Sequence, residues 1–281
     1  NVRAFLEGQG VELMLRCIRN GGHGGSGACK VLYFACSGPA VPSESETAYK
    51  RACEVLVEAG GLKQVFPLFM GRSSAIPKPA PCSDAGRALA AARKKTEKGR
   101  DDDQTSKKKK RKRRADAARK EWLREVEGNS IRIMYELTRH LDESSSSESK
   151  NRLLAKFLEG DCEKCDRVVE LCLKYDERSR LAEYQYYRSD EAEELEQTGA
   201  VDIELAALNA KLRGGGDILH RVCAIASFAS IGSRRCHEHI LGQFETQNAG
   251  MSVVKKALGE FAALLDEGHQ KEQLSGYLKA L

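Results

Sequence analysis

The sequence predicts an all-α protein that is built from stacked helical repeats. Apolar residues recur along the 281-residue chain at the i, i+3, i+4, i+7 spacing of one helix face. No stretch shows the sustained alternation of apolar and polar residues that is typical of a strand. Charged residues form 31% of the chain and aromatic residues only 6%, which suits a well-solvated helical protein better than a β-sandwich.

The clearest helical pair lies between Tyr49 and Met70. It contains two apolar stripes, formed by Ala52, Val55, Leu56 and Ala59 and by Leu62, Val65, Phe66 and Phe69. Gly60 and Gly61 separate the stripes, and a glycine after the last apolar turn can take the left-handed conformation that ends a helix. We therefore expect two helices that fold back on each other and need further helices on both sides, as in helical-repeat proteins.

Other segments show the same period on both sides of this pair. Before it, FLEGQGVELML predicts two short helical pieces joined at EGQG, and a further stripe covers residues 28–35. After it, helices are expected within residues 121–141, 151–158, 161–175, 218–229 and 253–265, and Asp161 is placed to cap the third of these. No apolar run approaches the ~20 residues that a membrane span needs. Because the chain begins with Asn rather than Met, we expect it to be part of a longer protein.

Several segments together resemble one known family. The segments FLEGQGVELML, ACKVLYFACSGP, GGLKQVFPLFM, NRLLAKFLEGDCEKCDRVVELCLKY and GGDILHRVCAIASFASIGSRRCHEHILGQF are similar, in this order, to the C-terminal half of the beta-catenin-like protein 1 family. The resemblance covers most of the chain outside a lysine-rich insert, and it includes no catalytic motif. It implies an armadillo-like α-solenoid from a nuclear, spliceosome-associated family. The long insert, the divergent acidic segment and the cysteines depart from the family pattern.

Composition divides the chain into three parts. We expect armadillo-like helical repeats in residues 1–72, a disordered insert rich in proline and lysine in residues 73–120, and a C-terminal armadillo-like helical region in residues 121–281. Between Arg93 and Lys120 there are 15 Lys/Arg against 5 Asp/Glu, a net charge of +10. Because the whole chain carries +5, the remainder is mildly acidic at −5. Like charges repel one another and bury little surface, which favours disorder in the insert.

The insert ends in a continuous basic run. This run consists of Lys107, Lys108, Lys109, Lys110, Arg111, Lys112, Arg113 and Arg114. Such a run is typical of a nuclear import signal, of a weak electrostatic contact with RNA or DNA phosphates, or of a solvated loop. No aromatic residue interrupts it, so stacking on nucleic-acid bases is not expected there.

An acidic segment follows between Arg180 and Glu204. Its candidate docking residues are Glu191, Glu193, Glu194, Glu196, Asp202 and Glu204, and Tyr184, Tyr186 and Tyr187 precede them. A run of carboxylates without a poised His or Lys indicates a solvated acidic face rather than acid–base catalysis. The functional alternative is a docking surface for a basic peptide, to which the tyrosines would add flat contact area.

The ten cysteines have irregular spacings, and most lie on predicted helix faces. We expect buried, reduced thiols rather than a disulfide framework. The CxxC spacing of Cys162 and Cys165, with Cys236, His237 and His239 downstream, raises the alternative of a zinc site. However, residues 162–172 are predicted to form one continuous helix and no second CxxC is present, so no metal site and no cofactor are expected. His220, His237 and His239 are expected at the surface or at helix caps.

These observations favour a non-enzymatic protein, because no nucleophile–base pair or phosphate-binding loop is present. The resemblance implies a nuclear scaffold or adaptor of the spliceosome in pre-mRNA splicing. It implies partners among proteins of the Prp-nineteen-type complex and among basic localisation-type peptides, with no role for a membrane. The alternative is an RNA-associating module that acts through the basic insert.

Overall fold

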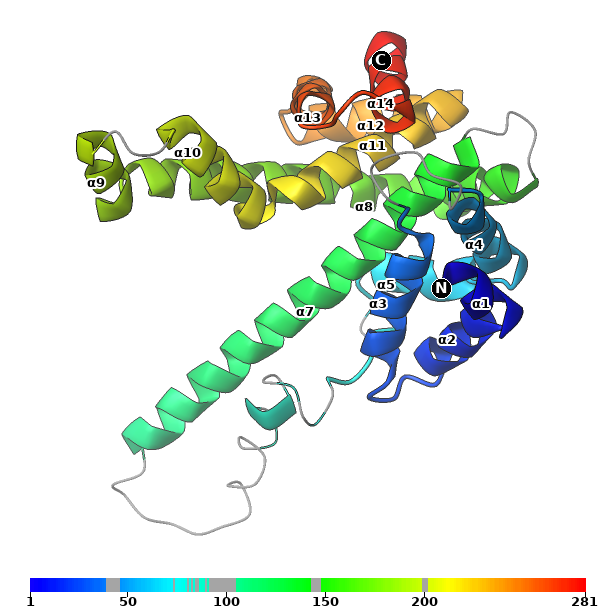
Figure 1. Cartoon of the computed structure of the whole chain (residues 1–281), viewed down its shortest axis with the longest axis horizontal. Helices are drawn as coiled ribbons and strands as arrows, with labels where there is room; N and C mark the ends of the chain where they lie inside the picture. The colour runs from blue at the N-terminus through cyan, green and yellow to red at the C-terminus, as the bar shows by residue number, and fades with distance from the viewer. Residues whose placement is uncertain are drawn as a thin grey trace. The chain divides into compact units, whose positions relative to one another are not determined.

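The computed structural model describes the chain except for residues 39–45, 73, 80, 82, 84–85, 89, 91–104, 143–147 and 199–201. All regular structure in the described part is helical, which confirms the all-α prediction (Figure 1). The chain separates into two compact units, of which the first contains residues 1–38 and 47–136 and the second contains Leu137–Leu281. The boundary falls inside the long helix α7 (Thr105–Asp142), whereas the sequence suggested a boundary near residue 120. No described helix is both long enough and apolar enough to cross a membrane.

The first unit combines five short helices with the first part of α7. They are α1 (Val2–Glu7), α2 (Gly10–Arg19), α3 (Gly25–Cys36), α4 (Glu46–Glu58) and α5 (Leu62–Phe69). The predicted corner between α4 and α5 is confirmed, since Gly60 has a left-handed φ of 76°. A Cβ on Gly61 would lie 2.6 Å from the carbonyl oxygen of Leu56, so the corner also needs a glycine there for close approach.

Contacts across the first unit attach α7 to the short helices. Lys30 of α3 forms an ion pair with Glu125 of α7. The Cys53 thiol of α4 donates a hydrogen bond of 3.8 Å to the carbonyl oxygen of Glu136. Trp122 is buried, which anchors the middle of α7 in the apolar core.

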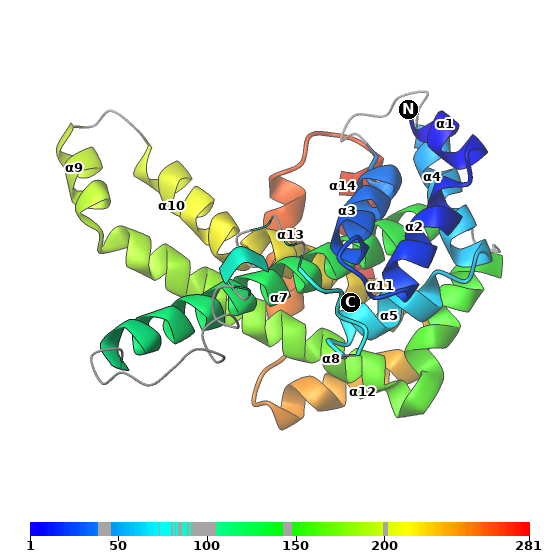
Figure 2. The same cartoon turned by 90° about the horizontal axis from the view of Figure 1, so that it is seen from below.

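The second unit is organised around helix α8 (Glu148–Tyr187). The elements that follow are α9 (Asp190–Thr198), α10 (Ile203–Lys211), the π-helical turn η2 (Leu212–Gly216), α11 (Asp217–Gly232), α12 (Arg234–Thr246), α13 (Ser252–Ala263) and α14 (His269–Ala280). Helix α8 contacts α10, η2, α11, α12 and α13, and α11 packs in turn on α12, α13 and α14. Both ribbon views place α9 and α10 at the C-terminal end of α8, away from α12 and α14 (Figures 1 and 2).

Two of the glycines in η2 allow it to lie directly on α8. A Cβ on Gly214 would lie 2.3 Å from the Cβ of Ala182. Gly215 has φ +133°, and a Cβ there would lie 2.7 Å from the ring of Tyr175, which is buried. The three-glycine sequence is therefore a close-packing surface that also sets where α10 joins α11.

Polar side chains are buried at two further contacts of the second unit. Lys211 donates to both carboxylate oxygens of Glu260, at 2.9 and 2.8 Å, and thereby links the end of α10 to α13. The Tyr277 hydroxyl of α14 donates to the Asp142 carboxylate at 2.8 Å. His220, which was expected at the surface or at a cap, is buried instead and stacks on the Phe261 ring at 5.1 Å. That expectation was wrong because α13 covers the face of α11 that carries His220.

Candidate functional site

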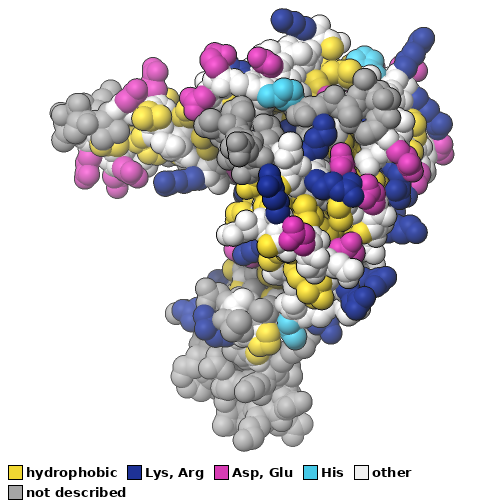
Figure 3. All heavy atoms as spheres, turned by 45° about the vertical axis from the view of Figure 1, so that its right-hand side comes forward, with side chains coloured by type: hydrophobic (Ala, Val, Ile, Leu, Met, Phe, Trp, Pro, Cys, Tyr) yellow, Lys and Arg dark blue, Asp and Glu magenta, His cyan; other side chains and the backbone are white. Residues whose placement is uncertain are grey.

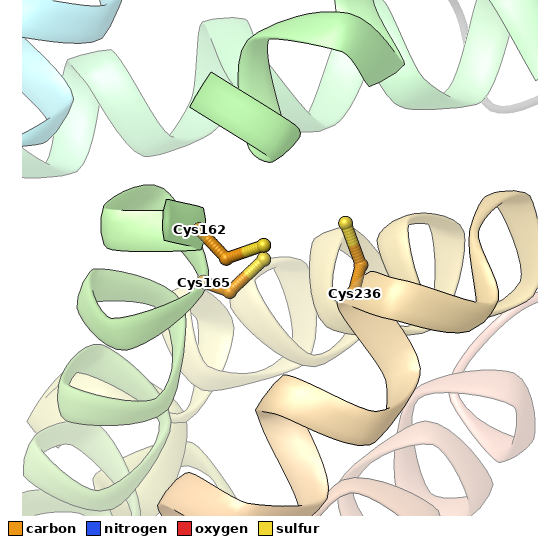
Figure 4. A group of neighbouring side chains, drawn as sticks. All are labelled: Cys162, Cys165 and Cys236. Carbon is orange, nitrogen blue, oxygen red and sulfur yellow. The ribbon is translucent and has the colours of Figure 1, made fainter. Parts of the chain in front are cut away.

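Three cysteine side chains from two helices meet in the interior of the second unit. Cys162 and Cys165 extend from α8 toward Cys236 on α12 (Figure 4). The three sulfur atoms all lie within 4.8 Å of one another. Each residue is buried, with 1% or less of its surface exposed. Of the groups of His, Cys, Asp and Glu in the described part of the chain, this is the one whose donor atoms converge closely enough to hold a metal ion.

The backbone of α8 breaks where the cluster begins. Glu159 has an extended ψ of 147°, and Gly160, Asp161 and Cys162 have left-handed φ values of 60°, 51° and 65°. Left-handed conformations at two successive non-glycine residues are costly and must be held by their surroundings. The expectation of one continuous helix across residues 162–172 was therefore wrong at its first residue, because the helix resumes only after Cys162.

Both helical segments that contribute to the cluster begin at it, so their N-terminal turns carry the thiols. Ser233 caps α12, and its hydroxyl oxygen accepts from the backbone N–H of Cys236 at 3.4 Å. Cys236 and Cys165 thus each occupy the third position after a helix start. Unpaired N–H groups and the helix dipole give this end of a helix a partial positive charge, which stabilises thiolates.

Charged side chains surround the cluster on the surface side. Arg235 donates to the Asp161 carboxylate at 3.1 Å, which joins α12 to the turn in α8. The Nε2 atom of His239 lies 2.6 Å from a carboxylate oxygen of Asp166. Lys164 forms an ion pair of 3.0 Å with Glu163. Two of these contacts, Arg235 with Asp161 and His239 with Asp166, connect α12 to α8 beside the thiols.

The three thiols have unequal acidities. A hydrogen bond from Cys165 is the main cause that lowers the pKa of the Cys236 thiol, to about 6. The same bond, together with burial, raises the pKa of Cys165. Burial raises the pKa of Cys162. The hydrogen bond between the two thiols therefore favours the thiolate at Cys236 over the thiolate at Cys165.

A second pair of cysteines lies nearby without forming such a cluster. The Cys223 thiol of α11 lies 3.8 Å from the sulfur of Cys172 on α8. Burial raises the pKa of Cys223 well above its usual range, so the Cys223 thiol remains protonated. All cysteines in the described residues are free thiols, as the sequence predicted.

The acidic segment forms an exposed surface on α9 and α10. The side chains of Glu191, Glu193, Glu194, Asp202 and Glu204 are exposed, whereas the side chain of Glu196 lies outside the described residues. Asp202 also caps α10, since its carboxylate accepts from the backbone N–H groups of Glu204 and Leu205. Figure 3 shows acidic side chains gathered on this part of the molecule. We refer to the end of α8 from Arg180 onward, together with α9 and α10, as the acidic arm.

Large apolar and aromatic side chains are exposed on the same arm. Tyr184 and Tyr187 on α8 expose about half of their surface, at 54% and 49%. Leu181 and Leu205 are exposed to a similar extent. The Arg188 guanidinium lies 4.9 Å from the centre of the Tyr184 ring, which is a cation–π contact. The arm thus combines flat aromatic surface with excess negative charge.

The basic run lies in the N-terminal part of α7, which corrects one expectation. Residues 105–120 are helical in the structure, whereas the sequence analysis placed them in a disordered insert. Lys and Arg are good helix formers, and no Gly or Pro occurs between Thr105 and Glu127, so the helix extends through the run. Lys112, Arg113 and Arg114 are exposed, whereas the side chains of residues 107–111 lie outside the described residues.

A family profile described as "Catenin-beta-like, Arm-motif containing nuclear" matches residues 1–85 and 104–259. This chain belongs to the catenin-beta-like family. The beta-catenin-like protein 1 of Bos taurus is 25% identical to it over 276 residues, which cover 97% of this chain and 39% of the relative. The Homo sapiens protein of the same name is 24% identical over the same shares. The chain thus spans about two fifths of the length of the curated relatives that it matches.

Membership of the catenin-beta-like family confirms the resemblance and the armadillo-like helical fold. Residues 86–103, which the family profile does not match, fall inside the expected insert of residues 73–120. Cys162, Cys165 and Cys236 fall inside the matched residues, as does the acidic arm. The sequence pointed to Cys162 and Cys165 by their spacing, but only the fold brings Cys236 to them.

Proposed function

We propose that this catenin-beta-like chain is a non-enzymatic nuclear adaptor of the spliceosome that binds basic peptide segments of partner proteins. The partners in this proposal are proteins of the Prp-nineteen-type complex and other proteins with basic localisation-type peptides. The family description supports a nuclear Arm-motif protein, and stacked helices supply extended surfaces for peptides. The acidic arm is the described surface whose chemistry suits a basic peptide best.

The observation that carries this proposal is the contact between Arg188 and Tyr184. The Arg188 guanidinium lies over the Tyr184 ring at 4.9 Å, and this cation–π contact within the chain supports the proposal that basic side chains bind on this surface. Tyr187 adds a second exposed ring one turn away on α8. Between Arg180 and Glu204 there are eight acidic and two basic residues, so an incoming cationic peptide is attracted electrostatically.

The test is the affinity of a fluorescent peptide of alternating Lys and Arg, measured by fluorescence anisotropy. An exposed cation–π contact contributes about 0.5–1 kcal/mol, so Tyr184→Ala combined with Tyr187→Ala should weaken binding about 5- to 30-fold. Phe34→Ala is the matched control, because Phe34 is an exposed aromatic residue of the first unit. Equal losses in the control and the double variant would contradict binding at the acidic arm.

Electrostatic attraction at the acidic arm can be tested separately from the aromatic contacts. Replacing Glu191, Glu193 and Glu194 by glutamine should lower the affinity and flatten its dependence on salt, because exposed charges are screened beyond about 8–10 Å at physiological ionic strength. The same peptide with its basic residues replaced by glutamine should not bind. A pull-down from nuclear extract, with mass spectrometry, then tests whether splicing proteins are recovered by the original chain and lost with the triple variant.

The alternative function is association with RNA through the basic run. The exposed Lys112, Arg113 and Arg114 support it, because such side chains can contact phosphates without reading sequence. Deleting residues 107–114 should abolish RNA retention in filter binding if this alternative holds, and leave recovery of protein partners unchanged. Retained RNA binding in the deletion variant would rule out the basic run as the contact.

A further inference from the structure

The three-cysteine cluster has the approximate dimensions of a tetrahedral metal site. Zinc–sulfur bonds of about 2.3 Å in a tetrahedron place sulfur atoms about 3.8 Å apart. The sulfur atoms of Cys162, Cys165 and Cys236 lie within 4.8 Å of one another, so a shift of about 1 Å would bring all three into bonding range.

The backbone conformation of the turn in α8 brings two of the three thiols together. Its left-handed residues Asp161 and Cys162 place the first thiol beside the second, three residues later. Arg235 of α12 contacts the turn through an exposed ion pair with Asp161, at 3.1 Å. A strained turn beside converging donor atoms is an expected feature of a site that must be preorganised.

The charge balance of the cluster suits a soft divalent cation. Three thiolates and one Zn²⁺ carry a net charge of −1, which needs positive surroundings to be stable inside a protein. Two helix N-terminal turns supply them here, while Arg235 lies beside the cluster in an ion pair with Asp161. Thiolate ligands select zinc or copper(I) over the hard cations magnesium and calcium.

The candidate for a fourth donor is His239 on α12, which lies outside the group of donor atoms that converge within 4.8 Å. His239 follows Cys236 by three residues, so the two side chains lie on the same face of the helix. Its Nε2 atom is held by the Asp166 carboxylate at 2.6 Å, which leaves Nδ1 as the ring atom for a metal. A carboxylate that orients the imidazole in this way is typical of histidine ligands in metalloproteins.

We propose that Cys162, Cys165 and Cys236 bind Zn²⁺ as thiolates and that His239 is the fourth ligand. On binding, each thiol releases its proton to solvent. The ion fixes the turn of α8 to the first turn of α12, which makes the site structural. This site lies near the start of the long segment of α8, distant from the acidic arm at its end, so the inference is independent of the proposed function.

The first experiment measures metal in the full 281-residue chain. Protein purified without a histidine tag from medium containing zinc should hold about one zinc ion per chain by elemental mass spectrometry. After removal of zinc under reducing conditions, Co²⁺ should give the visible and thiolate charge-transfer bands of a tetrahedral cysteine-rich site. Zn²⁺ should then displace Co²⁺ and abolish these bands. Absence of both zinc and the Co²⁺ bands would overturn the proposal.

Alanine variants separate ligands from ordinary buried cysteines. Cys162→Ala, Cys165→Ala and Cys236→Ala should each reduce zinc affinity at least 100-fold, whereas Cys172→Ala and Cys223→Ala should retain about one zinc ion per chain. The controls replace buried thiols of α8 and α11, 3.8 Å apart, that have no third partner. His239→Ala should weaken zinc binding about 10- to 100-fold. An unchanged affinity in His239→Ala would exclude it as a ligand.

Two further measurements keep the test decisive if a variant folds poorly. Thermal unfolding of the original chain by circular dichroism should shift to higher temperature when zinc is added to the metal-free protein, and the shift should vanish in Cys236→Ala. Mass spectrometry under non-reducing conditions reports whether two of the three thiols are joined. A stable disulfide within the cluster in the freshly purified protein would contradict a metal site.

Discussion

Replacing Gly215 by alanine should loosen the attachment of η2 to α8. Gly215 has φ +133°, a conformation that L-amino acids rarely adopt. A Cβ at this position would also lie 2.7 Å from the Tyr175 ring. The ring has little room to move, because it is buried and lies within 5.1 Å of the Arg178 guanidinium and 5.4 Å of the Lys174 ammonium.

The expected loss of stability has two parts. The backbone conformation costs a non-glycine residue about 1–3 kcal/mol, and overpacking against a fixed ring costs about 1–3 kcal/mol. Gly215→Ala should therefore lower the free energy of unfolding by roughly 2–6 kcal/mol, against a typical total of about 5–15 kcal/mol. Gly242 in α12 is the matched control, since a Cβ there meets no atom within 4 Å. Gly242→Ala should stabilise by about 0.5–1 kcal/mol.

Urea denaturation followed by far-ultraviolet circular dichroism measures both variants. Hydrogen–deuterium exchange of peptides from residues 171–187 then reports whether the loss is local to the contact between η2 and α8. The midpoint should fall for Gly215→Ala and rise for Gly242→Ala, with faster exchange at residues 171–187 only in the former. If both variants have the same midpoint, neither the φ angle nor the Tyr175 ring constrains this position.

Three further predictions concern buried polar groups of the second unit. Lys211→Met leaves Glu260 without its main partner and should cost about 2–4 kcal/mol of unfolding free energy in urea denaturation, since a broken buried pair leaves a charge behind. Burial lowers the pKa of His220 to about 4. Between about pH 6.5 and pH 4 the unfolded chain therefore binds a proton at His220 that the folded chain does not bind. The free energy of unfolding should fall by up to about 1.4 kcal/mol for each pH unit across this range. Tyr277→Phe removes the hydroxyl that donates to Asp142 and should cost about 1 kcal/mol, measured by the same denaturation.

Each of these predictions has a control. Arg234→Ala removes an exposed ion pair with Glu238, and its midpoint should not move. His220→Gln should flatten the decline of stability between pH 6.5 and 4, and an unchanged slope would mean that another group titrates. For Tyr277, a variant as stable as the original chain would show that the contacts of Gln273 and Lys150 hold the end of α7 without the hydroxyl.

Local features of the fold followed from the sequence because their causes are local. The corner at Gly60 and Gly61 was predicted, since it needs only two apolar stripes and a residue that tolerates a positive φ. The basic run differs from its prediction. Repulsion between like charges suggested disorder there, but strong helix formers and the buried Trp122 downstream extend helix α7 through the run.

The candidate site was only partly predictable. The spacing of Cys162 and Cys165 was visible, yet Cys236 is 71 residues beyond Cys165 and joins them only because α12 packs on α8. The break in α8 was also underestimated, because apolar periodicity continues on both sides of it. Gly160 and Asp161 were the available evidence, since both residue types adopt left-handed conformations more readily than most. The burial of His220 depends on α13 and could not be read from its own helix.

The length of α8 beyond its turn has a mechanical consequence. From Glu163 to Tyr187 the helix continues without a further break, a lever of about 37 Å at 1.5 Å per residue. A rotation of about 10° at the turn would swing the far tip by about 6 Å, more than one helical pitch. Because the residues from Glu159 to Cys162 set the direction of this segment, a change in their backbone angles would be amplified at the tyrosines.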